Sequence, residues 1–236
     1  MSSNELLNLQ GVVKQFGGFK ALNNLNLSIK QGEILGLVGP NGSGKTTCIN
    51  IISGLYRPNA GTIVFNGVDV TGWPLHRLVH HGLNRTFQLP KPFKSLTVKE
   101  NVAIARRYGK PSRSVPEPLE FLGLEVLADR QANQLNSSQQ KLLDLARALA
   151  TSPDLLLIDE LAAGLNPAEM AVIADKLVAL SSQGMALLVV EHHLSFINRL
   201  TQRVVVMNAG REIYEGSLTD AAQNPTVIEV YLGRTD

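Results

Sequence analysis

Short apolar runs and amphipathic stretches alternate along the chain. Four runs are apolar at every position and too short for typical helices, a pattern that favours buried strands of a largely parallel sheet. The stretches between them carry apolar residues at helical spacing, as in Leu142, Leu145 and Leu149, and later in Ile173 and Leu177. Strands alternating with helices predict an α/β fold. The four predicted strands are Ile34 to Val38, Leu155 to Ile158, Ala186 to Val190 and Val204 to Met207.

Other segments predict a smaller antiparallel sheet and a separate helical region. Leu25, Leu27 and Ile29 alternate as in a half-exposed strand, and residues 61–65 lead into Asn66-Gly67, a strong hairpin-turn signal. From about residue 90 to 151 the strand pattern is replaced by a helical one, interrupted by a Pro-rich segment at 109–118 that predicts a surface loop. We predict a single domain, 1–236. Residues 90–151 form its inserted helical subdomain, and residues 1–89 and 152–236 form its core.

One helix start is marked especially well. Asn166 suits an N-cap, Pro167 suits the first helical position, and Glu169 can complete a capping box. We therefore predict that a helix begins directly after Asn166.

Composition and charge exclude several classes of protein. Hydrophobic residues make up 44% and charged residues 18%, and the mean hydropathy is close to zero, which is ordinary for a globular chain and unlike an integral membrane protein. The net charge of +2 arises from 22 basic and 20 acidic residues spread along the sequence, so no nucleic-acid partner is expected. Cys48 is the only cysteine, which favours a reducing compartment such as the cytosol. No signal peptide or membrane span is recognisable, so membrane contact is expected only through a partner.

The segment GPNGSGKT fits the pattern G-x-x-x-x-G-K-[ST], and it lies between a predicted strand and a predicted helix, as that motif requires. Its glycines let backbone N–H groups close on phosphates, and the helix N-terminus adds partial positive charge. Lys45 is predicted to reach the outer phosphates, and the Thr46 hydroxyl is predicted to ligate Mg²⁺. The predicted phosphate site consists of Gly39, Asn41, Gly42, Ser43, Gly44, Lys45, Thr46 and Thr47.

Two further predicted strands end in polar side chains. LLLIDE ends in Asp159 and Glu160, and carboxylates at a buried strand end require a cation or a polar ligand. Asp159 is predicted to hold Mg²⁺ through its water, and Glu160 to orient and deprotonate the attacking water. VVEHH suggests that His192 bonds the γ-phosphate, although this pattern alone fits a solvated histidine as well.

The order of these motifs resembles the nucleotide-binding subunits of ABC transporters over nearly the whole chain. The resemblance implies that Phe16, in KQFGGFKAL, stacks on adenine; a core phenylalanine is the alternative. It implies that Gln88, in RTFQLPKPF, links Mg²⁺ to the transmembrane partner, and that His192 is the family's switch histidine. The segments GLNRTFQLPKPFKSLTVKENV, AAGLNP and NPTVIEVYLG look most like the ATPase subunits of branched-chain amino-acid importers. The cargo class is implied by resemblance alone, because such a subunit does not touch the cargo.

The chain departs from the family pattern at two places. The family signature is Leu-Ser-Gly-Gly-Gln, or often Leu-Ser-aromatic-Gly-Gln in this subfamily, and it caps the γ-phosphate bound to the opposite subunit. Here it reads Leu135, Asn136, Ser137, Ser138 and Gln139. The resemblance assigns the last four to nucleotide binding, but a side chain at position 138 is expected to obstruct the approach if the family's glycine served a positive φ.

The second departure is Leu161, which stands where the family usually has a proline after the catalytic glutamate; a modest loosening of that loop is expected. Since the chain's own ATP site retains its motifs, we hypothesise that a heterodimer would have one strong and one weak composite site.

These observations predict a P-loop NTPase of the ABC ATPase type, an α/β fold with a mixed sheet core, an antiparallel β subdomain and an inserted helical subdomain. The expected function is that of an ATP-hydrolysing motor subunit that uses ATP and Mg²⁺. Glu160, His192, Gln88 and Lys45 are its expected catalytic residues, with Thr46, Gln88 and Asp159 at the metal.

The expected partners are permease subunits and a second ATPase subunit, at the cytoplasmic face of the membrane. The alternatives are a soluble ABC-type ATPase not coupled to transport and a weakly hydrolysing regulatory subunit.

Overall fold

The computed structural model describes residues 5–110 and 116–232 and contains two sheets. The larger sheet has the strand order β10-β9-β3-β8-β7-β6, and its strands are parallel except for the antiparallel pair β9 and β10. The strands of this sheet are β3 (Ile34–Val38), β6 (Leu83–Arg85), β7 (Leu155–Asp159), β8 (Ala186–Val190), β9 (Val204–Asn208) and β10 (Arg211–Gly216). All four predicted strands are confirmed. Two of them extend one residue further than predicted, so Asp159 ends β7 and Glu160 begins the loop that follows.

The smaller sheet is antiparallel, as predicted, with the order β2-β1-β4-β5. Its strands are β1 (Glu5–Phe16), β2 (Phe19–Lys30), β4 (Ala60–Phe65) and β5 (Val68–Asp69). The turn between β4 and β5 is the expected one, because Asn66 and Gly67 have φ values of 49° and 75°. Two consecutive left-handed residues give the hairpin turn that matches the twist of the flanking strands.

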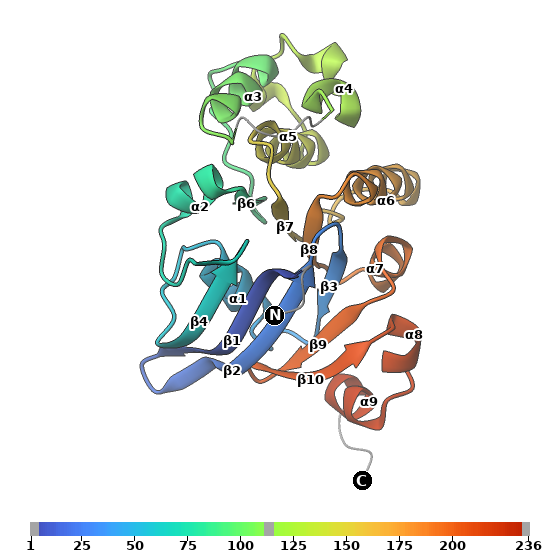
Figure 1. Ribbon diagram of the computed structural model, residues 1–236. Helices are drawn as coiled ribbons and strands as arrows, with labels where there is room; N and C mark the ends of the chain where they lie inside the picture. Colours follow the sequence, from blue (N-terminus) through green and yellow to red (C-terminus); the bar gives the residue numbers. More distant parts are fainter. Residues whose placement is uncertain (1–4, 111–115, 233–236) are drawn as a thin grey trace.

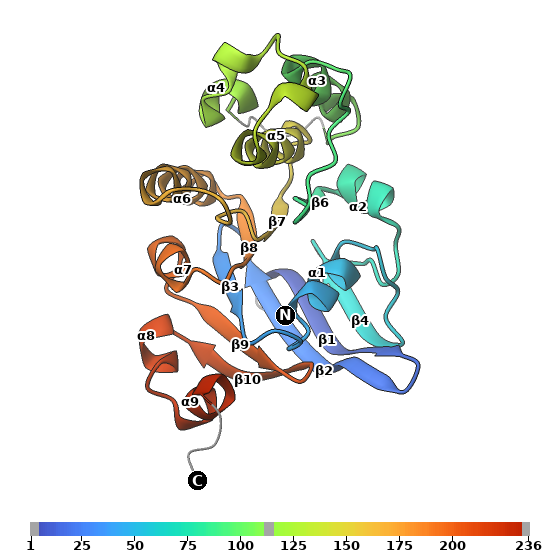
Figure 2. The ribbon, with the colours of Figure 1, turned by 180° about the vertical axis from the view of Figure 1, so that it is seen from behind.

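The helices lie in three groups (Figures 1 and 2). One group, at the end of the molecule beyond β6 and β7, consists of α3 (Val98–Arg107), α4 (Pro118–Leu122) and α5 (Ser137–Ala150). A second group lies along one side of the large sheet and consists of α6 (Pro167–Ser182), α7 (Leu194–Leu200), α8 (Leu218–Ala221) and α9 (Pro225–Leu232). The remaining helices are α1 (Lys45–Ile52), α2 (Leu75–His81) and the 3₁₀ turns η1 (Glu125–Leu127) and η2 (Ala132–Gln134).

Alternate residues of the large sheet face two separate cores. On β3, Ile34 and Val38 pack with the helices from α3 to α9, whereas Leu35 and Leu37 pack with α1 and the antiparallel sheet. Helix α1 therefore lies between the two sheets. Burial on both faces explains why these strands are apolar at every position, since a solvated face would have required polar residues at alternate positions.

The helix starts follow from local hydrogen bonding. Asn166 caps α6 with the predicted capping box, in which its side chain accepts from the amides of Ala168 and Glu169. The loop predicted at 109–118 ends one residue earlier in the structure, because Pro118 is the first residue of α4. The first helical position suits proline, whose φ is fixed and whose N–H is missing. Residues 111–115 of that segment lie outside the described residues.

Candidate functional site

The phosphate-loop motif connects β3 to α1, as predicted, and its backbone needs glycine. Gly39 has a φ of 148°, and a Cβ there would collide with the carbonyl oxygen of Met207. Gly44 has a φ of 109°, and a Cβ there would lie 2.7 Å from the carbonyl oxygen of Ala21. Both positions exclude a side chain for steric as well as conformational reasons. The loop is therefore wrapped closely over the edge of the sheet.

Two polar groups of this loop are arranged for an anion. The Lys45 ammonium donates to the carbonyl oxygens of Gly39 (2.8 Å) and Pro40 (3.0 Å), so it crosses the loop interior. Burial lowers the pKa of Lys45, and the nearby carboxylates of Glu160 and Asp159 partly offset that effect. The Ser43 hydroxyl is buried, and no group in the described part of the chain hydrogen-bonds to it. A phosphate oxygen would give both groups a partner.

Two residues from distant parts of the sequence contact the Glu160 carboxylate. Its Oε2 accepts a hydrogen bond from Gln88 Nε2 at 2.7 Å, and its Oε1 lies 3.0 Å from His192 Nε2. Gln88 follows β6, Glu160 follows β7 and His192 follows β8, and these three strands are adjacent and parallel. Parallel strands bring their carboxyl ends to one edge, where ligands bind in open α/β sheets.

Asp159 lies in a different environment. Its carboxylate is buried, and Oδ2 lies 3.4 Å from Arg85 Nη2. Burial raises the pKa of Asp159, while the Arg85 charge opposes that rise. The same guanidinium donates to Asn50 Oδ1 (2.7 Å) and Ser53 Oγ (3.1 Å). Arg85 therefore joins the strand that bears Asp159 to α1 behind the phosphate loop.

The phosphate loop, Glu160 and His192 line a cavity of about 260 Å³. Phe16 is not one of the residues that line it: this side chain is 43% exposed and packs edge-on against Tyr56, with 5.3 Å between ring centroids. Phe19, its partner across the β1–β2 hairpin, does line the cavity. The lining residues are Phe19, Ala21, Asn41, Gly42, Ser43, Gly44, Lys45, Thr46, Thr47, Glu160 and His192.

The signature segment, residues 136–139, lies elsewhere, at the start of α5. None of the described residues that line the cavity comes from it. Asn136 is the N-cap, and its side chain accepts from the Gln139 amide in a capping box. Ser138 is within the helix and does not have a positive φ, so the condition under which a side chain at this position was expected to obstruct the approach does not hold in this chain. Its hydroxyl instead donates to the Gly164 carbonyl at 2.9 Å.

Several buried charged residues that support the site were not predicted. The Asp144 carboxylate accepts from the amide of Phe87 (2.8 Å), and that of Glu191 accepts from the amide of Ala162 (2.7 Å). Burial raises the pKa of both carboxyls, and these backbone bonds oppose the rise. Glu191 follows a fully apolar strand directly, which is the one sequence signal that could have indicated its role. Asp144 lies within an ordinary amphipathic helix pattern and gave no signal.

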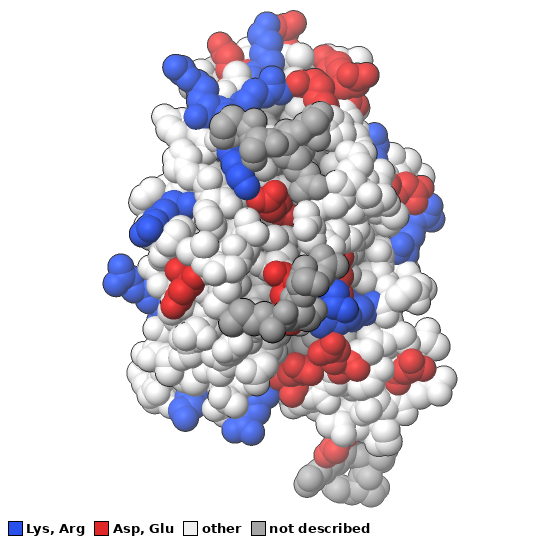
Figure 3. Space-filling model, in the orientation of Figure 1, with Lys and Arg blue, Asp and Glu red and all other residues white. Residues whose placement is uncertain are grey.

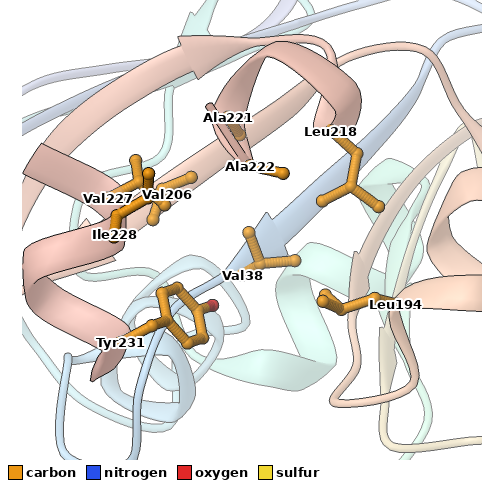
Figure 4. A pocket seen from close by; sticks show the side chains of 9 residues that line it. All are labelled: Val38, Leu194, Val206, Leu218, Ala221, Ala222, Val227, Ile228 and Tyr231. Carbon is orange, nitrogen blue, oxygen red and sulfur yellow. The ribbon is translucent and has the colours of Figure 1, made fainter. Parts of the chain in front are cut away.

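A second cavity of about 270 Å³ lies among α7, α8, α9 and the large sheet (Figure 4). Its lining is apolar except for the Tyr231 hydroxyl, so it offers nothing for the phosphates of a nucleotide. The phosphate-loop cavity is therefore the candidate nucleotide site.

A large sheet whose phosphate loop and carboxylates meet at the carboxyl ends of its strands defines a P-loop nucleotide-binding protein. Residues 22–163 match the family model described as "ABC transporter". A probable branched-chain amino acid transport ATP-binding protein, LivG, of Archaeoglobus fulgidus is 40% identical over 98% of this chain and 97% of its own length.

Two solved structures extend the comparison. An ATP-binding cassette of an ABC transporter in its ADP conformation is 34% identical with a TM-score of 0.87, over 98% of this chain and 99% of that one. A dimeric cassette in a post-hydrolysis state with ADP and Pi is 28% identical with a TM-score of 0.80, over 90% and 98%. The chain belongs to the ABC transporter ATP-binding family. It is the subunit of such a transporter that binds and hydrolyses ATP. No helix in the described ranges, 5–110 and 116–232, is long and apolar enough to cross a membrane.

Proposed function

We propose that this chain drives import of branched-chain or related amino acids, and that its cavity performs the hydrolysis with Glu160 as the base. The observation that carries the site assignment is the double hydrogen bonding of Glu160 to Gln88 and His192 at the cavity. Those two partners hold both carboxylate oxygens in place. A positioned carboxylate is what proton abstraction from an attacking water requires.

The other predicted residues fit a nucleotide lying across this cavity. The loop from Gly39 to Thr47 provides N–H donors for the phosphates, and Lys45 would exchange its bonds to the loop carbonyls for bonds to the outer phosphates. Phe16 lies outside the residues that line the cavity, so the adenine would extend beyond them to reach its aromatic face. His192 bonds to Glu160 and, in this proposal, donates to the γ-phosphate of a bound nucleotide.

The metal-ligating residues assigned by the sequence fit Mg²⁺ as oxygen donors. The Thr46 hydroxyl lines the cavity, the Asp159 carboxylate ends the neighbouring strand, and Gln88 supplies an amide oxygen, which together form the hard oxygen set that Mg²⁺ prefers. When bound, Mg²⁺ would neutralise charge on the β- and γ-phosphate oxygens. Asp159 remains partly balanced by Arg85, so its carboxylate is held in one orientation.

The first test of the adenine contact compares Phe16→Ala with Phe19→Ala. Aromatic stacking on a base contributes about 1–3 kcal/mol, so Phe16→Ala is expected to weaken ATP binding about tenfold or more. Phe19→Ala, on the opposite side of the same hairpin, is the matched control and should change the affinity less. A larger loss in Phe19→Ala, measured by titration with a fluorescent ATP analogue, would transfer the adenine contact to Phe19.

A second cassette subunit is the proposed partner of residues 136–139. These residues do not line the chain's own cavity, and the related post-hydrolysis cassette structure is dimeric. The N-terminus of α5 presents backbone N–H groups and the Asn136 amide to an anion held by the opposite subunit. Hydrolysis then alternates with closing and opening of the dimer.

A permease is the proposed partner of the segment after Gln88. Leu89 is 76% exposed and Phe93 is 47% exposed, and large exposed apolar side chains within one short segment favour a protein contact. The segment is anchored from both sides, because Asp144 binds the amide of Phe87 and Asn101 binds the amide of Phe93. Motion of the helical region would therefore reach this surface directly.

The location we propose is the cytoplasmic face of the membrane, with attachment through the permease. On the face shown in Figure 3, the described Lys and Arg side chains do not form a continuous stripe, and acidic side chains lie between their groups. That surface gives no reason to invoke direct binding to anionic lipids or nucleic acid.

Purification of the tagged chain from gently solubilised membranes tests the partners. Recovery of a polytopic permease together with a second, different ATPase is expected. Leu89→Ser with Phe93→Ser should abolish recovery of the permease, whereas Val172→Ser on α6, also exposed, should not. Recovery of soluble partners alone would support a soluble ABC-type ATPase instead.

Uptake of radiolabelled leucine, isoleucine and valine tests the cargo. Deletion of this chain should abolish uptake of at least one of them, and the wild-type chain should restore it while Lys45→Ala does not. Unchanged uptake of all three would reject branched-chain amino acids as cargo without affecting the assignment as an ABC transporter ATPase.

A further inference from the structure

Two side chains at the start of α5 hold the loop that carries Glu160. Lys141 Nζ donates to the carbonyl oxygens of Glu160 (2.7 Å) and Ala163 (2.8 Å). One turn earlier, Ser138 Oγ donates to the carbonyl oxygen of Gly164 at 2.9 Å. These three hydrogen bonds, which we call the α5 tie, connect the helical region to residues 160–164.

The loop needs such a restraint. Glu160 has a φ of 51°, a left-handed conformation that is unfavourable for a residue with a side chain and persists when its surroundings hold it. The Glu160 carbonyl leaves the sheet at this point, and Lys141 is its hydrogen-bond donor. From the other side, Glu191 accepts from the Ala162 amide. The loop is therefore held by two charged side chains from different parts of the fold: the Lys141 ammonium on α5 and the Glu191 carboxylate after β8.

Among the residues that the structure describes, Lys141 forms no ion pair, and its ammonium is used for these two carbonyl contacts. Its ammonium binds carbonyl oxygens rather than a carboxylate, although the charges of Glu191, Glu160 and Asp159 all act on it. A charged donor forms a stronger hydrogen bond to a carbonyl than a neutral one does. Ser138 adds a second attachment that a glycine at this position could not provide.

We propose that Ser138 and Lys141 are positioning residues for hydrolysis, which fix the direction of the Glu160 carboxylate by tying its loop to α5. The inference rests on the proposed role of Glu160. It follows that a rotation of the helical region moves the hydrolytic carboxylate with it, so the orientation of α5 decides whether Glu160 faces the attacking water. Ser138 then serves its own subunit's site, in addition to any contact of its helix with the opposite subunit.

Amide hydrogen exchange of residues 161–165 in the full chain, without nucleotide, tests the tie directly. Lys141→Met removes a charged donor and should speed exchange by about tenfold or more, and Ser138→Ala should speed it by about threefold. Ser137→Ala is the matched control. The Ser137 hydroxyl is exposed, lies next to Ser138 in the sequence and makes none of these three bonds, so its removal should leave the exchange of the loop unchanged. Lys141→Arg retains a donor and should restore slow exchange.

Turnover in the assembled transporter provides the second measurement. Lys141→Met is expected to lower kcat by about tenfold with the KM for ATP unchanged, because the loop from Gly39 to Thr47 is not touched. Lys141→Arg should recover most of kcat.

Loop exchange in Lys141→Met and Ser138→Ala equal to that of the wild type would overturn the proposal. Exchange needs no catalysis, so if Glu160→Gln retains turnover while Lys141→Met loosens the loop, the role of Glu160 fails and the tie itself stands.

Discussion

Asp159 and Glu160 are neighbours in the sequence, yet the fold gives them opposite surroundings. The Asp159 side chain is 3% exposed and pairs with the equally buried Arg85, whereas that of Glu160 is 23% exposed and is held by the neutral side chain of Gln88 and by His192. The difference arises because β7 ends between them: Asp159 is its last residue, and Glu160 turns into the left-handed region. Two consecutive residues therefore place one carboxylate in the protein interior and the other at the substrate cavity.

The largest expected effect belongs to the exposed member of the pair. Glu160→Gln keeps the shape and the hydrogen bond to Gln88 but removes the base, so turnover should fall by about 10³-fold. ATP binding and the free energy of unfolding should change little. Steady-state hydrolysis with the partner subunits measures turnover, and nucleotide titration measures ATP binding. Turnover within a factor of two of the wild type would assign the base elsewhere.

Asp159→Asn should lower the stability of the chain even when no nucleotide is present, in addition to weakening the proposed contact with Mg²⁺. It leaves the buried Arg85 guanidinium without its nearest carboxylate, which is expected to lower the free energy of unfolding by about 3 kcal/mol. Asp175→Asn, which breaks an exposed ion pair with Arg199, is the control and should change it by less than about 1 kcal/mol. Urea denaturation of the nucleotide-free chain compares the two variants. Equal changes would mean that burial does not distinguish these carboxylates.

His192→Ala should have an intermediate effect. It removes one of the two groups bonded to the Glu160 carboxylate, which is also the proposed donor to the γ-phosphate, so turnover is expected to fall by at least about tenfold, the value of one hydrogen bond. The other partner, Gln88, should keep a measurable residual rate. A loss as large as that of Glu160→Gln would show that His192 takes part in the chemistry itself rather than in orientation.

The smallest effect should come from the third carboxyl near the pair, Glu191. Burial raises its pKa in the folded chain, so folding favours the protonated form. The resulting penalty is absent below the unfolded-state pKa and complete above the folded-state pKa, and the free energy of unfolding therefore falls as the pH rises through that interval. Glu191→Gln should remove this component and can still accept from Ala162. Asp144 and Asp159 contribute to the same pH dependence, so the prediction is a smaller slope in the variant; denaturation at several pH values would contradict it if the slope equalled that of the wild type.

The sequence predicted the parts of the site that depend on local pattern. The phosphate loop follows from glycine spacing between a strand and a helix, and the alignment of Glu160 and His192 follows from two adjacent parallel strands. It could not show that Gln88 reaches the same carboxylate, because β6 is only three residues long and carries little pattern. The family resemblance implied a different role for Gln88, the link between Mg²⁺ and the transmembrane partner. The tie through Lys141 was not predicted either, since it joins a helix to a loop through side-chain length and direction. The condition behind the expectation about Ser138, a positive φ, could not be judged from the sequence, because a motif comparison contains no φ value.

The single cysteine is buried, so the rate at which its thiol reacts can report local opening of the fold around α1. Cys48 is fully buried on α1, immediately behind the phosphate loop, and burial raises its pKa to about 12. In the native state it is therefore both shielded and protonated, and neither condition permits attack on a thiol reagent. Labelling can proceed only from molecules in which α1 has separated from the sheets. The rate of thiol labelling, with and without ATP, would thus report how strongly the nucleotide closes the structure around it, with no engineered probe.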